Sequence, residues 1–416
     1  MAHTIAEKIF SEKLGRDVRP GEYITASIDR AMAHEAFGLS WMQIMGAGLS
    51  GVWDPEKVVV LFDHYIPAPT ERMATAHMMI RNAVQSAGIT HYYGEREGIC
   101  HQVMMEKGHV RPGWLIVGTD SHTTTYGALG AAGTGLGTTE MAYVLAKGEL
   151  WFKVPETVRF VLKGDLPDRV MSKDAMLHIA GAYTAEAAQY KSVEFVGDGA
   201  DALSLESRIT MSNMAVEIGA KFGFFNADHK TLDFLKGRAD GELKAITADP
   251  DASYEATYEV NLSQLEPQVA CPHTVDNVRS VREVKGTPIQ QAVLGSCTNG
   301  RLEDLATAAE ILKGKTINPF TRLYVYPASR EVYLKAMETG VLKTISEAGG
   351  VICNPSCGAC FGAHMGLLGA GEVCISSTNR NFKGRMGSAS AEVYLASPAT
   401  VAASAIKGEI TDPREV

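Results

Sequence analysis

The sequence predicts an α/β protein in which parallel or mixed sheets are flanked by helices. Two observations predict this class. Short runs of β-branched and other apolar residues, typical of buried strands, alternate with longer stretches of helical periodicity. Several of these runs end in polar side chains, as parallel strands do at a ligand-binding edge. The 416 residues exceed what one hydrophobic core normally serves. Changes in the content of charged and loop-forming residues divide the chain into three expected domains, at residues 1–153, 154–285 and 286–416.

The first segment begins with a capping box at Thr4 and Glu7, which predicts a short helix that Gly15 ends. Its other elements follow from helical periodicity and from the strand-like runs K-V-V-V-L-F and W-L-I-V. We expect a helix over 29–45, a strand over 57–62, a helix over 70–86, a strand over 114–117 and a helix over 139–150.

The second segment opens with an edge strand from about residue 154 and has a helical pattern at residues 212–221. Residues 226–285 are polar and poorly periodic, as in a peripheral subdomain or a linker. The third segment alternates strands and helices again. Its strands are expected at 291–294, 323–326, 351–352 and 373–376, followed by a helix rich in small residues at 389–407.

Composition limits the possible partners and compartments. The net charge of −9 argues against nucleic acid and anionic membranes as partners. Seven cysteines in a chain of this length indicate free thiols in the reducing cytoplasm and no disulfide framework. Charged residues interrupt the N-terminal apolar residues, so no signal peptide is expected. No apolar run reaches the length of a membrane span. We therefore expect a cytoplasmic protein.

Cysteines mark the most informative stretch, V-I-C-N-P-S-C-G-A-C-F-G-A at residues 351–363. Cys357 and Cys360, joined with Cys297 upstream, suit an iron–sulfur cluster with one open iron, because thiolates are soft anionic ligands. Structural zinc fits less well, since it normally takes four protein ligands. With Cys353 the spacing is also the C-x-x-x-C-x-x-C of radical S-adenosylmethionine enzymes. In that family the motif comes early and an aromatic residue precedes its last cysteine, but Ala359 stands there. Cys353 is therefore interpreted as a non-ligand.

Polar residues follow five of the predicted strands. They are Asp63-His64, Asp120-Ser121-His122, Ser296-Cys297, the run from Asn354 to Cys360, and Asn379-Arg380. Because the carboxyl ends of parallel strands form one crevice, they predict a single composite site. A carboxylate beside an imidazole fixes its tautomer and raises its basicity, so both Asp–His motifs are candidate acid–base groups. Arg380 and Arg385 near a metal would bind a carboxylate.

A glycine-rich run at residues 127–137 precedes the helix over 139–150. Its G-T-G-L-G-T-T element is weakly similar to a dinucleotide-binding loop. Thr138 stands where that motif has its third glycine, and the run is not expected to follow a strand directly. Close packing of backbone segments is the favoured interpretation.

Taken together, six motifs resemble the aconitase superfamily over the whole chain and in the same order. They are F-D-H at 62–64, G-T-D-S-H-T at 118–123, M-A-V-E-I-G-A at 214–220, G-S-C-T-N-G-R-L-E-D at 295–304, N-P-S-C-G-A-C at 354–360 and N-R-N-F-K-G-R at 379–385. The likeness is greatest to the large subunits of the 3-isopropylmalate dehydratase and homoaconitase branch. It implies a three-domain aconitase-like fold that lacks the swivelling fourth domain.

This resemblance also implies the cofactor and the residue roles. One 4Fe-4S cluster would be held by Cys297, Cys357 and Cys360, and its labile fourth iron would bind the substrate. The implied catalytic residues are Asp63, His64, His101, Asp120, His122 and Glu217. The implied substrate-binding residues are Ser121, Asn213, Asn299, Asn379, Arg380 and Arg385.

The implied activity is that of an iron–sulfur hydro-lyase and isomerase of a hydroxy di- or tricarboxylic acid. The first expected substrate is 3-isopropylmalate, and the expected pathway is leucine biosynthesis. Homoaconitase and methylmalate or dimethylmalate dehydratase large subunits are the alternatives within the branch. Because no fourth-domain pattern follows the third, a separate small subunit is expected, in a heterodimer or heterotetramer. An RNA-binding or iron-sensing relative and a structural zinc protein are the alternatives from other classes.

Overall fold

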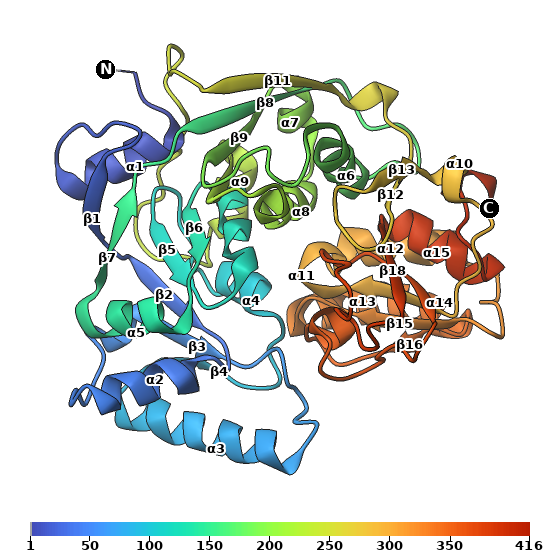
Figure 1. Ribbon diagram of the computed structural model, residues 1–416, viewed down its shortest axis with the longest axis horizontal. Helices are drawn as coiled ribbons and strands as arrows, with labels where there is room; N and C mark the ends of the chain where they lie inside the picture. The colour runs from blue at the N-terminus through green and yellow to red at the C-terminus, as the bar shows by residue number, and fades with distance from the viewer. Residues whose placement is uncertain (1) are drawn as a thin grey trace.

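Three large sheets, one in each successive part of the chain, organise the computed structural model, which describes residues 2–416 (Figure 1). In Figure 1 the N-terminal part lies at the left, the middle part at the top and the C-terminal part at the right. This arrangement confirms the predicted α/β class with parallel and mixed sheets. The boundaries of the three domains stay a prediction.

The first sheet has five strands, all parallel. Its central strands are apolar on both faces, because helices cover both sides. In sheet order the strands are β4 (His91–Tyr93), β3 (Val58–Leu61), β2 (Arg30–Ala33), β5 (Leu115–Gly118) and β6 (Ala132–Gly135). The helices of this part are α1 (Ile5–Leu14), α2 (Phe37–Gly46), α3 (Glu71–Ser86), α4 (Cys100–Glu106) and α5 (Thr138–Lys147).

One prediction for this part is wrong. Residues 29–45 are not one helix, because the short strand β2 precedes α2, and four residues are too few for alternation to show in the sequence. The glycine-rich run begins in a 3-10 helix (Ser121–Leu129), so it does not directly follow a strand, and the short strand β6 lies within the run and includes Gly133 and Gly135. The close-packing interpretation is confirmed: a Cβ on Gly133 would lie 2.2 Å from the carbonyl oxygen of Thr123.

The second sheet has four parallel strands. In sheet order they are β10 (Phe222–Phe225), β9 (Ser192–Val196), β8 (Thr157–Lys163) and β11 (Ala256–Asn261). The sequence predicts that β8 lies at an edge, but β8 is internal. Six of its seven residues, all but Thr157, pair with β11. The helices are α6 (Ser172–Tyr183), α7 (Asp198–Ala202), α8 (Leu205–Met214) and α9 (His229–Leu235). The helical pattern at 212–221 is split, since α8 ends at Met214 and a 3-10 turn, Ala215–Ile218, follows.

The third sheet is mixed and has seven strands. In sheet order they are β13 (Val278–Ser280), β12 (Gln268–Ala270), β18 (Glu392–Ala396), β17 (Val373–Ser376), β14 (Gln291–Gly295), β15 (Arg322–Tyr326) and β16 (Val351–Ile352). Its helices are α10 (Val281–Val284), α11 (Ser296–Asn299), α12 (Leu302–Leu312), α13 (Arg330–Glu338), α14 (Val341–Glu347) and α15 (Pro398–Lys407).

Two predictions near this sheet are also wrong. Of the two interpretations of residues 226–285, the linker is wrong, because the region supplies α9, β11, β12 and β13, whose exposed faces explain the weak hydrophobic periodicity. The peripheral subdomain stays a prediction. The segment 389–407, expected as one helix, is a strand followed by a helix. In β18 buried side chains alternate with more exposed ones over residues 392–395, and Pro398 begins α15. A further two-stranded antiparallel sheet joins β1 (Tyr23–Ser27) and β7 (Glu149–Lys153).

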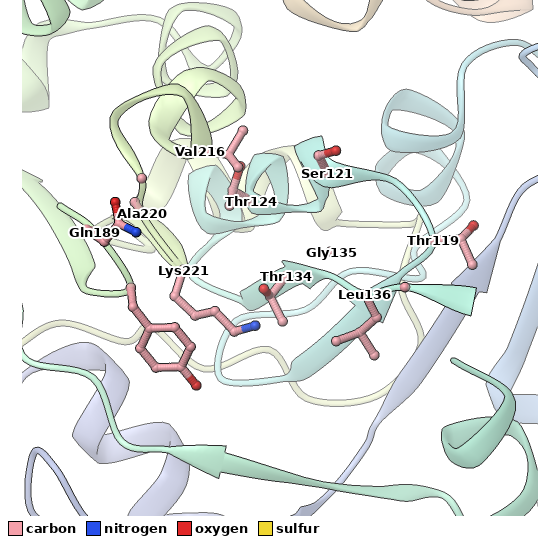
Figure 2. Close-up of a pocket in the computed structure, with 13 residues that line it drawn as sticks. Thr119, Ser121, Thr124, Thr134, Gly135, Leu136, Gln189, Val216, Ala220 and Lys221 are labelled. Atoms are coloured by element: carbon pink, nitrogen blue, oxygen red, sulfur yellow. The ribbon is translucent and has the colours of Figure 1, made fainter. Parts of the chain in front are cut away.

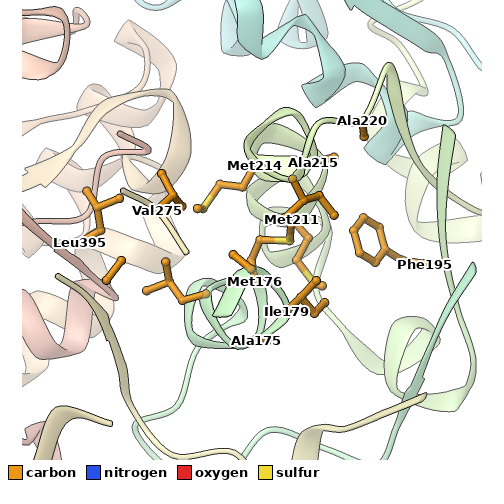
Figure 3. Close-up of a cluster of buried hydrophobic side chains, with 14 of the residues drawn as sticks. Ala175, Met176, Ile179, Phe195, Met211, Met214, Ala215, Ala220, Val275 and Leu395 are labelled. Atoms are coloured by element: carbon orange, nitrogen blue, oxygen red, sulfur yellow. The ribbon is translucent and has the colours of Figure 1, made fainter. Parts of the chain in front are cut away.

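One hydrophobic core connects the second and third parts. Figure 3 shows Met176 and Ile179 of α6 packed beside Met211 and Met214 of α8, with Leu395 of β18 at the same core. Helix α6 thus lies between two sheets and buries most of its length. Within residues 2–416, no helix is long and apolar enough to cross a membrane.

Candidate functional site

The site forms where the carboxyl ends of parallel strands from the first and third sheets face each other. The first sheet supplies Asp63 after β3 and Asp120 after β5, and the third supplies Cys297 after β14 and Arg380 after β17. The 3-10 turn after α8 adds Glu217 from the second part. Parallel sheets place all such strand ends on one edge, which explains why residues so distant in sequence converge.

Three buried thiols, those of Cys297, Cys357 and Cys360, lie at the centre. Two amide side chains surround the first of them: Asn213 Nδ2 and Asn379 Nδ2 each lie 3.3 Å from Cys297 Sγ. The Cys360 thiol donates to Asn379 Oδ1 at 3.5 Å. Amide N–H groups aimed at sulfur stabilise a thiolate, the form that binds metal. The predicted substrate residues Asn213 and Asn379 therefore lie against the cysteines.

Two glycines allow the cysteine turns to form. Gly295, before Cys297, has φ +125°, and a Cβ there would lie 2.1 Å from the carbonyl oxygen of Tyr326. Gly358, between Cys357 and Cys360, has φ +54°, and its Cβ would lie 2.3 Å from Tyr326 Cε1. Tyr326 is thus the surface against which both turns pack. Only a residue without a side chain fits either position.

The spacing of the sulfurs fits a polynuclear centre better than a single ion. Two thiolates on one zinc ion lie at most about 4.6 Å apart, because each Zn–S bond is about 2.3 Å long. Among residues 2–416, a set of three or more ligand atoms within 4.8 Å of one another occurs at His34, Glu35, Asp63 and His64, and the three thiols form no such set. Cysteines that bind separate irons of one cluster need the wider spacing.

Cys353 lies apart from the three buried thiols. Its side chain is partly exposed, and its Sγ lies 3.9 Å from the carbonyl oxygen of Val351 on its own strand. The tyrosine hydroxyl of Tyr326 is its polar neighbour. The thiol therefore does not join the group formed by Cys297, Cys357 and Cys360.

The Asp63–His64 pair is the first acid–base element. His64 Nδ1 lies 2.6 Å from Asp63 Oδ1, and Asp63 Oδ2 accepts the backbone N–H of Cys100 at 2.8 Å. The other ring nitrogen, His64 Nε2, lies 3.4 Å from Asp120 Oδ2. Asp63 also faces the cysteines, since its Oδ2 lies 3.8 Å from Cys357 Sγ. The dyad thus connects the second Asp–His motif with the thiols.

Asp120 is the centre of a larger network. Its Oδ1 lies 2.8 Å from His101 Nε2 and accepts the backbone N–H of His122 at 2.8 Å. His122 Nε2 in turn lies 2.7 Å from Glu217 Oε1. Tyr126, whose hydroxyl is 3.4 Å from His101 Nδ1, completes the network on the buried side. His101, ambiguous in sequence, is placed in the site.

Arg380 joins this network from the third sheet. Its Nε donates to Glu217 Oε1 at 2.8 Å and its Nη1 donates to Ser121 Oγ at 3.3 Å. Arg385 lies close to Cys360, and the negative charge of a Cys360 thiolate helps to raise the pKa of this guanidinium against the effect of burial. One guanidinium group, that of Arg385, therefore lies beside the thiols, and the other, that of Arg380, lies at the acid–base network. Guanidinium groups are well suited to bind carboxylates.

Burial and pairing shift the ionisation of these groups. Burial opposes the charged form of Asp63, but the adjacent His64 outweighs it and lowers the pKa of Asp63 to about 2. Burial also opposes charge on His64, yet Asp63 and Asp120 raise the pKa of this imidazole well above its ordinary value. Burial raises the pKa of the Cys297 thiol to about 12, whereas Arg385 and His122 overcome burial and lower the pKa of Cys360.

Asn299 is directed away from the thiols. Its Nδ2 donates to Asp304 Oδ1 at 2.8 Å and to Thr210 Oγ1 at 3.3 Å. These bonds join the start of α12 to α8, so the side chain serves the packing behind the site. In this orientation the Asn299 side chain does not face the position at which substrate is predicted to bind.

Sequence reasoning missed His34 and Glu35, which follow β2 at the same sheet edge. The ring of His34 stacks on that of His64 with centroids 4.3 Å apart. Glu35 Oε1 accepts the backbone N–H groups of His64 at 3.0 Å and Tyr65 at 2.9 Å. The sequence does not reveal them, because its pattern predicts one helix over residues 29–45 and hides the strand β2. A short apolar run followed by His-Glu is the signal that could have revealed them.

Lys173 was also missed. It is fully buried on α6, and its Nζ donates to the carbonyl oxygens of Ser377, at 3.1 Å, and Thr378, which precede Asn379. Burial lowers the pKa of this ammonium to about 7 against the attraction of the Cys360 and Cys297 thiolates. A buried cation thus fixes the loop that carries Asn379 and Arg380.

Comparison with known proteins finds relatives over the whole chain. The sequence matches the Aconitase family (aconitate hydratase) over residues 7–287 and 281–408. It is 51% identical over 415 residues to 3-isopropylmalate dehydratase large subunit 1 of Methanopyrus kandleri, covering 100% of this chain and 99% of that one. It is 47% identical over 417 residues to the probable methanogen homoaconitase large subunit of Methanothermobacter thermautotrophicus, covering 99% of this chain and 97% of that one.

A solved structure shares the fold. The crystal structure of Thermococcus kodakaraensis aconitase X in its holo-form has a TM-score of 0.52 and 14% sequence identity to this chain, covering 91% of this chain and 89% of that one. The family match and the full-length relatives, on a fold with this composite site, show that the chain belongs to the aconitase family.

Proposed function

We propose that this chain is the large, cluster-binding subunit of an iron–sulfur hydro-lyase and isomerase acting on a hydroxy di- or tricarboxylic acid, with 3-isopropylmalate as the first candidate substrate. The convergence of three buried thiols with two Asp–His pairs and two arginines is the observation that carries the proposal. The name of the M. kandleri relative supports the choice of substrate.

The three thiols would hold a 4Fe-4S cluster, with its fourth iron free for substrate. When bound, such a cluster supplies a Lewis acid that weakens the C–O bond of a substrate hydroxyl without a net redox change. The amides of Asn213 and Asn379 would donate to ligand sulfur, and Lys173 would fix the loop that carries Asn379.

The side chains around the thiols have roles that follow from their contacts. Arg380 and Arg385 would bind a carboxylate of the substrate and orient its hydroxyl group toward the dyad. The charged His64, held by Asp63 through Nδ1, carries a proton on Nε2 that it can donate to the departing hydroxyl. Asp120, His101, His122 and Glu217 would keep the neighbouring hydrogen-bond network in one protonation pattern.

The partner would be a separate small subunit. The relatives are named as large subunits, and the abstraction of the carbon-bound proton has no assigned base in the network described above. We propose that the small subunit supplies this base in a heterodimer or heterotetramer. We also propose a cytoplasmic location, because all seven cysteines are free thiols, as in a reducing compartment.

Homoaconitase is the second candidate, and the relative from M. thermautotrophicus favours it. The two activities differ in the substituent on the substrate, so an assay with both 3-isopropylmalate and homocitrate separates them. Turnover of homocitrate alone would move the proposal to this candidate.

Anaerobic reconstitution with iron and sulfide tests the cofactor. We expect the protein to take up about four irons per chain and to gain broad visible absorption, as thiolate-bound iron–sulfur centres do. Cys357→Ser should abolish this uptake, whereas Cys353→Ser, the matched control, should leave it unchanged. Uptake of zinc in place of iron, or equal loss in both variants, would contradict the proposal.

A further inference from the structure

A cavity of about 490 Å³ lies beside the site, between the glycine-rich loop and the second part of the chain (Figure 2). Ser121 forms its edge toward the site, where the serine accepts a hydrogen bond from Arg380. From there the cavity extends to Thr134, Gly137, Tyr190 and Lys221, which have no place in the acid–base network. The proposed function does not use this part of the cavity.

Lys221 brings an unpaired positive charge to the cavity. Within residues 2–416 its ammonium forms no ion pair and no side-chain hydrogen bond, and its nearest described contact is the ring of Tyr190, 5.5 Å away. Burial lowers the pKa of Lys221, and attraction by Glu140 only partly opposes this effect. Glu140 forms no ion pair with it. A partly buried ammonium without an anionic partner is unfavourable, and a bound anion would stabilise it.

Thr134 supplies a hydroxyl group that also lacks a partner. Its residue is only 3% exposed, and no hydrogen bond to its side chain occurs among the described residues. Figure 2 shows this hydroxyl on the same side of the cavity as the Lys221 nitrogen. A buried hydroxyl normally has a hydrogen-bond partner. Because the hydroxyl faces the cavity, it is available as a donor or acceptor to a polar group bound there.

The N-terminus of α5 lies at the same wall. This helix has ten residues, and its N-cap, Gly137, provides no side-chain acceptor for the first N–H groups. The helix dipole adds positive potential there. The side chain of Glu140 approaches Gly137 and reduces this potential, since a Cβ on the glycine would lie 2.7 Å from Glu140 Oε2.

We propose that this cavity is a carboxylate-binding site in which Lys221 and Thr134 hold the carboxylate oxygens. The cavity offers one ammonium, one hydroxyl and a helix N-terminus, and an acidic residue lies nearby. This set suits a ligand group with a single negative charge better than a phosphate with two. The volume accommodates a small acid or one acidic side chain. Two sources supply this chemistry: a free hydroxy acid entering past Ser121, or an acidic side chain of the small subunit. The second source rests on the proposed function.

Chemical labelling of Lys221 tests the site without needing the cluster or turnover. The rate of acetylation of this lysine by a trace of acetic anhydride is measured by mass spectrometry in the whole large subunit. It is measured alone, with 3-isopropylmalate, with citrate, with inorganic phosphate and with the small subunit. We expect labelling to slow about tenfold or more in a carboxylate arm or in the small-subunit arm, as a charge-assisted bond of this strength would cause. The arm that slows labelling identifies the source.

Variants separate carboxylate binding from simple coverage. Lys221→Gln should weaken binding of the source so identified by about tenfold or more, and Thr134→Val by a smaller factor. Lys191→Gln is the matched control, because Lys191 lies nearby but is already paired with Glu255 at 2.7 Å, and it should leave binding unchanged. Equal affinities for Lys221→Gln and Lys191→Gln, absence of protection in every arm, or protection by phosphate alone would each overturn the proposal.

Failure of the cavity site and failure of the proposed function give different results. A protein that binds no iron but protects Lys221 with a free carboxylate would overturn the hydro-lyase and support the cavity site. A protein that binds the cluster and turns over substrate while Lys221 stays fully reactive would do the reverse.

Discussion

Glu106 shows how single buried residues connect the parts of this molecule outside the site. Its Oε1 accepts hydrogen bonds from Gln102 on its own helix, α4, at 2.9 Å and from Ser329, the N-cap of α13, at 2.7 Å. The first and third sheets are thereby joined through one carboxyl group. Burial raises the pKa of Glu106 to about 7, despite these two hydrogen bonds.

This shift predicts a pH dependence of stability. Between the ordinary value of 4.5 and about 7, the folded protein holds a proton on Glu106 that the unfolded chain releases. The free energy of unfolding therefore falls as pH rises through this range, by about 1–3 kcal/mol, and does not recover above it. We expect Glu106→Gln to remove this contribution, so that chemical denaturation at pH 5 and pH 8 gives more similar stabilities than in the unmodified protein.

Glu338→Gln is the control for this prediction, because Glu338 lies exposed at the end of α13. It should keep the pH dependence of the unmodified protein. An unchanged pH dependence in Glu106→Gln would show that the carboxyl group stays ionised in the folded protein.

At the scale of elements, the cysteine turns depend on their contact with β15. Tyr326 lies at the end of this strand, and its ring and backbone meet the turns after both β14 and β16. Its hydroxyl donates to the carbonyl oxygen of Met365 in the loop that follows. The position of Cys357 and Cys360 is therefore set by packing against a neighbouring strand as well as by their own short turn.

Gly358→Ala tests this dependence. The added Cβ would meet Tyr326 Cε1 at 2.3 Å and would occupy a left-handed backbone conformation. We expect a loss of stability of about 2–4 kcal/mol, from conformational strain and overpacking together, and weaker cluster retention. Denaturant unfolding and the iron content after reconstitution measure the two effects.

Gly371→Ala provides a matched control. Gly371 has φ +75°, but nothing lies within 4 Å of its Cβ position, so only the conformational cost of about 1 kcal/mol applies. Equal losses in the two variants would show that Tyr326 moves aside and that the close approach does not set the turn.

At the scale of the whole molecule, α6 joins two sheets. Its buried side chains belong to a core that includes residues of β8 and β9 on one side and of β14, β17 and β18 on the other. Figure 3 shows Met176 at the centre of this core. The second and third parts should therefore unfold together, because neither sheet keeps its core without the helix.

Met176→Ala should reveal this coupling. Met176 is fully buried, so we expect a loss of about 2–5 kcal/mol. Amide hydrogen exchange should rise both in β9 and in β18. Met337→Ala, on the exposed side of α13 with Met337 55% exposed, should change stability by less than about 0.5 kcal/mol. Faster exchange confined to β9 would contradict a shared core.

Much of the site could be predicted from local sequence. Motifs such as Asp63-His64 and Cys357–Cys360 follow buried apolar runs. Those runs form strands of sheets whose two faces are covered by helices. The polar residues at the strand ends therefore predict a single crevice. Where the apolar run is very short, as in β2, the sequence pattern predicts a helix instead of a strand. The sequence therefore does not reveal His34 and Glu35, which follow β2.

Other features lay beyond the local pattern. The internal position of β8 depends on β11, almost a hundred residues later, so the periodicity of β8 alone could not distinguish an edge from a centre. No local pattern marks Lys173 as buried, because its partners, the carbonyl oxygens of Ser377 and Thr378, lie about two hundred residues away. The same is true of Lys221, whose cavity includes the glycine-rich loop.

The sequence by itself determined the α/β class, the resemblance to the aconitase superfamily and the chemical groups of the site, because these depend on residue types, short spacings and local periodicity. Only the tertiary structure decided which side chains touch. It separated Cys353 from the other thiols, directed Asn299 to Asp304 and joined His122 to Glu217. It also left the Lys221 ammonium without an ion-pair partner among residues 2–416. Each of these outcomes depends on contacts between segments far apart in the chain, and local sequence does not encode such distances.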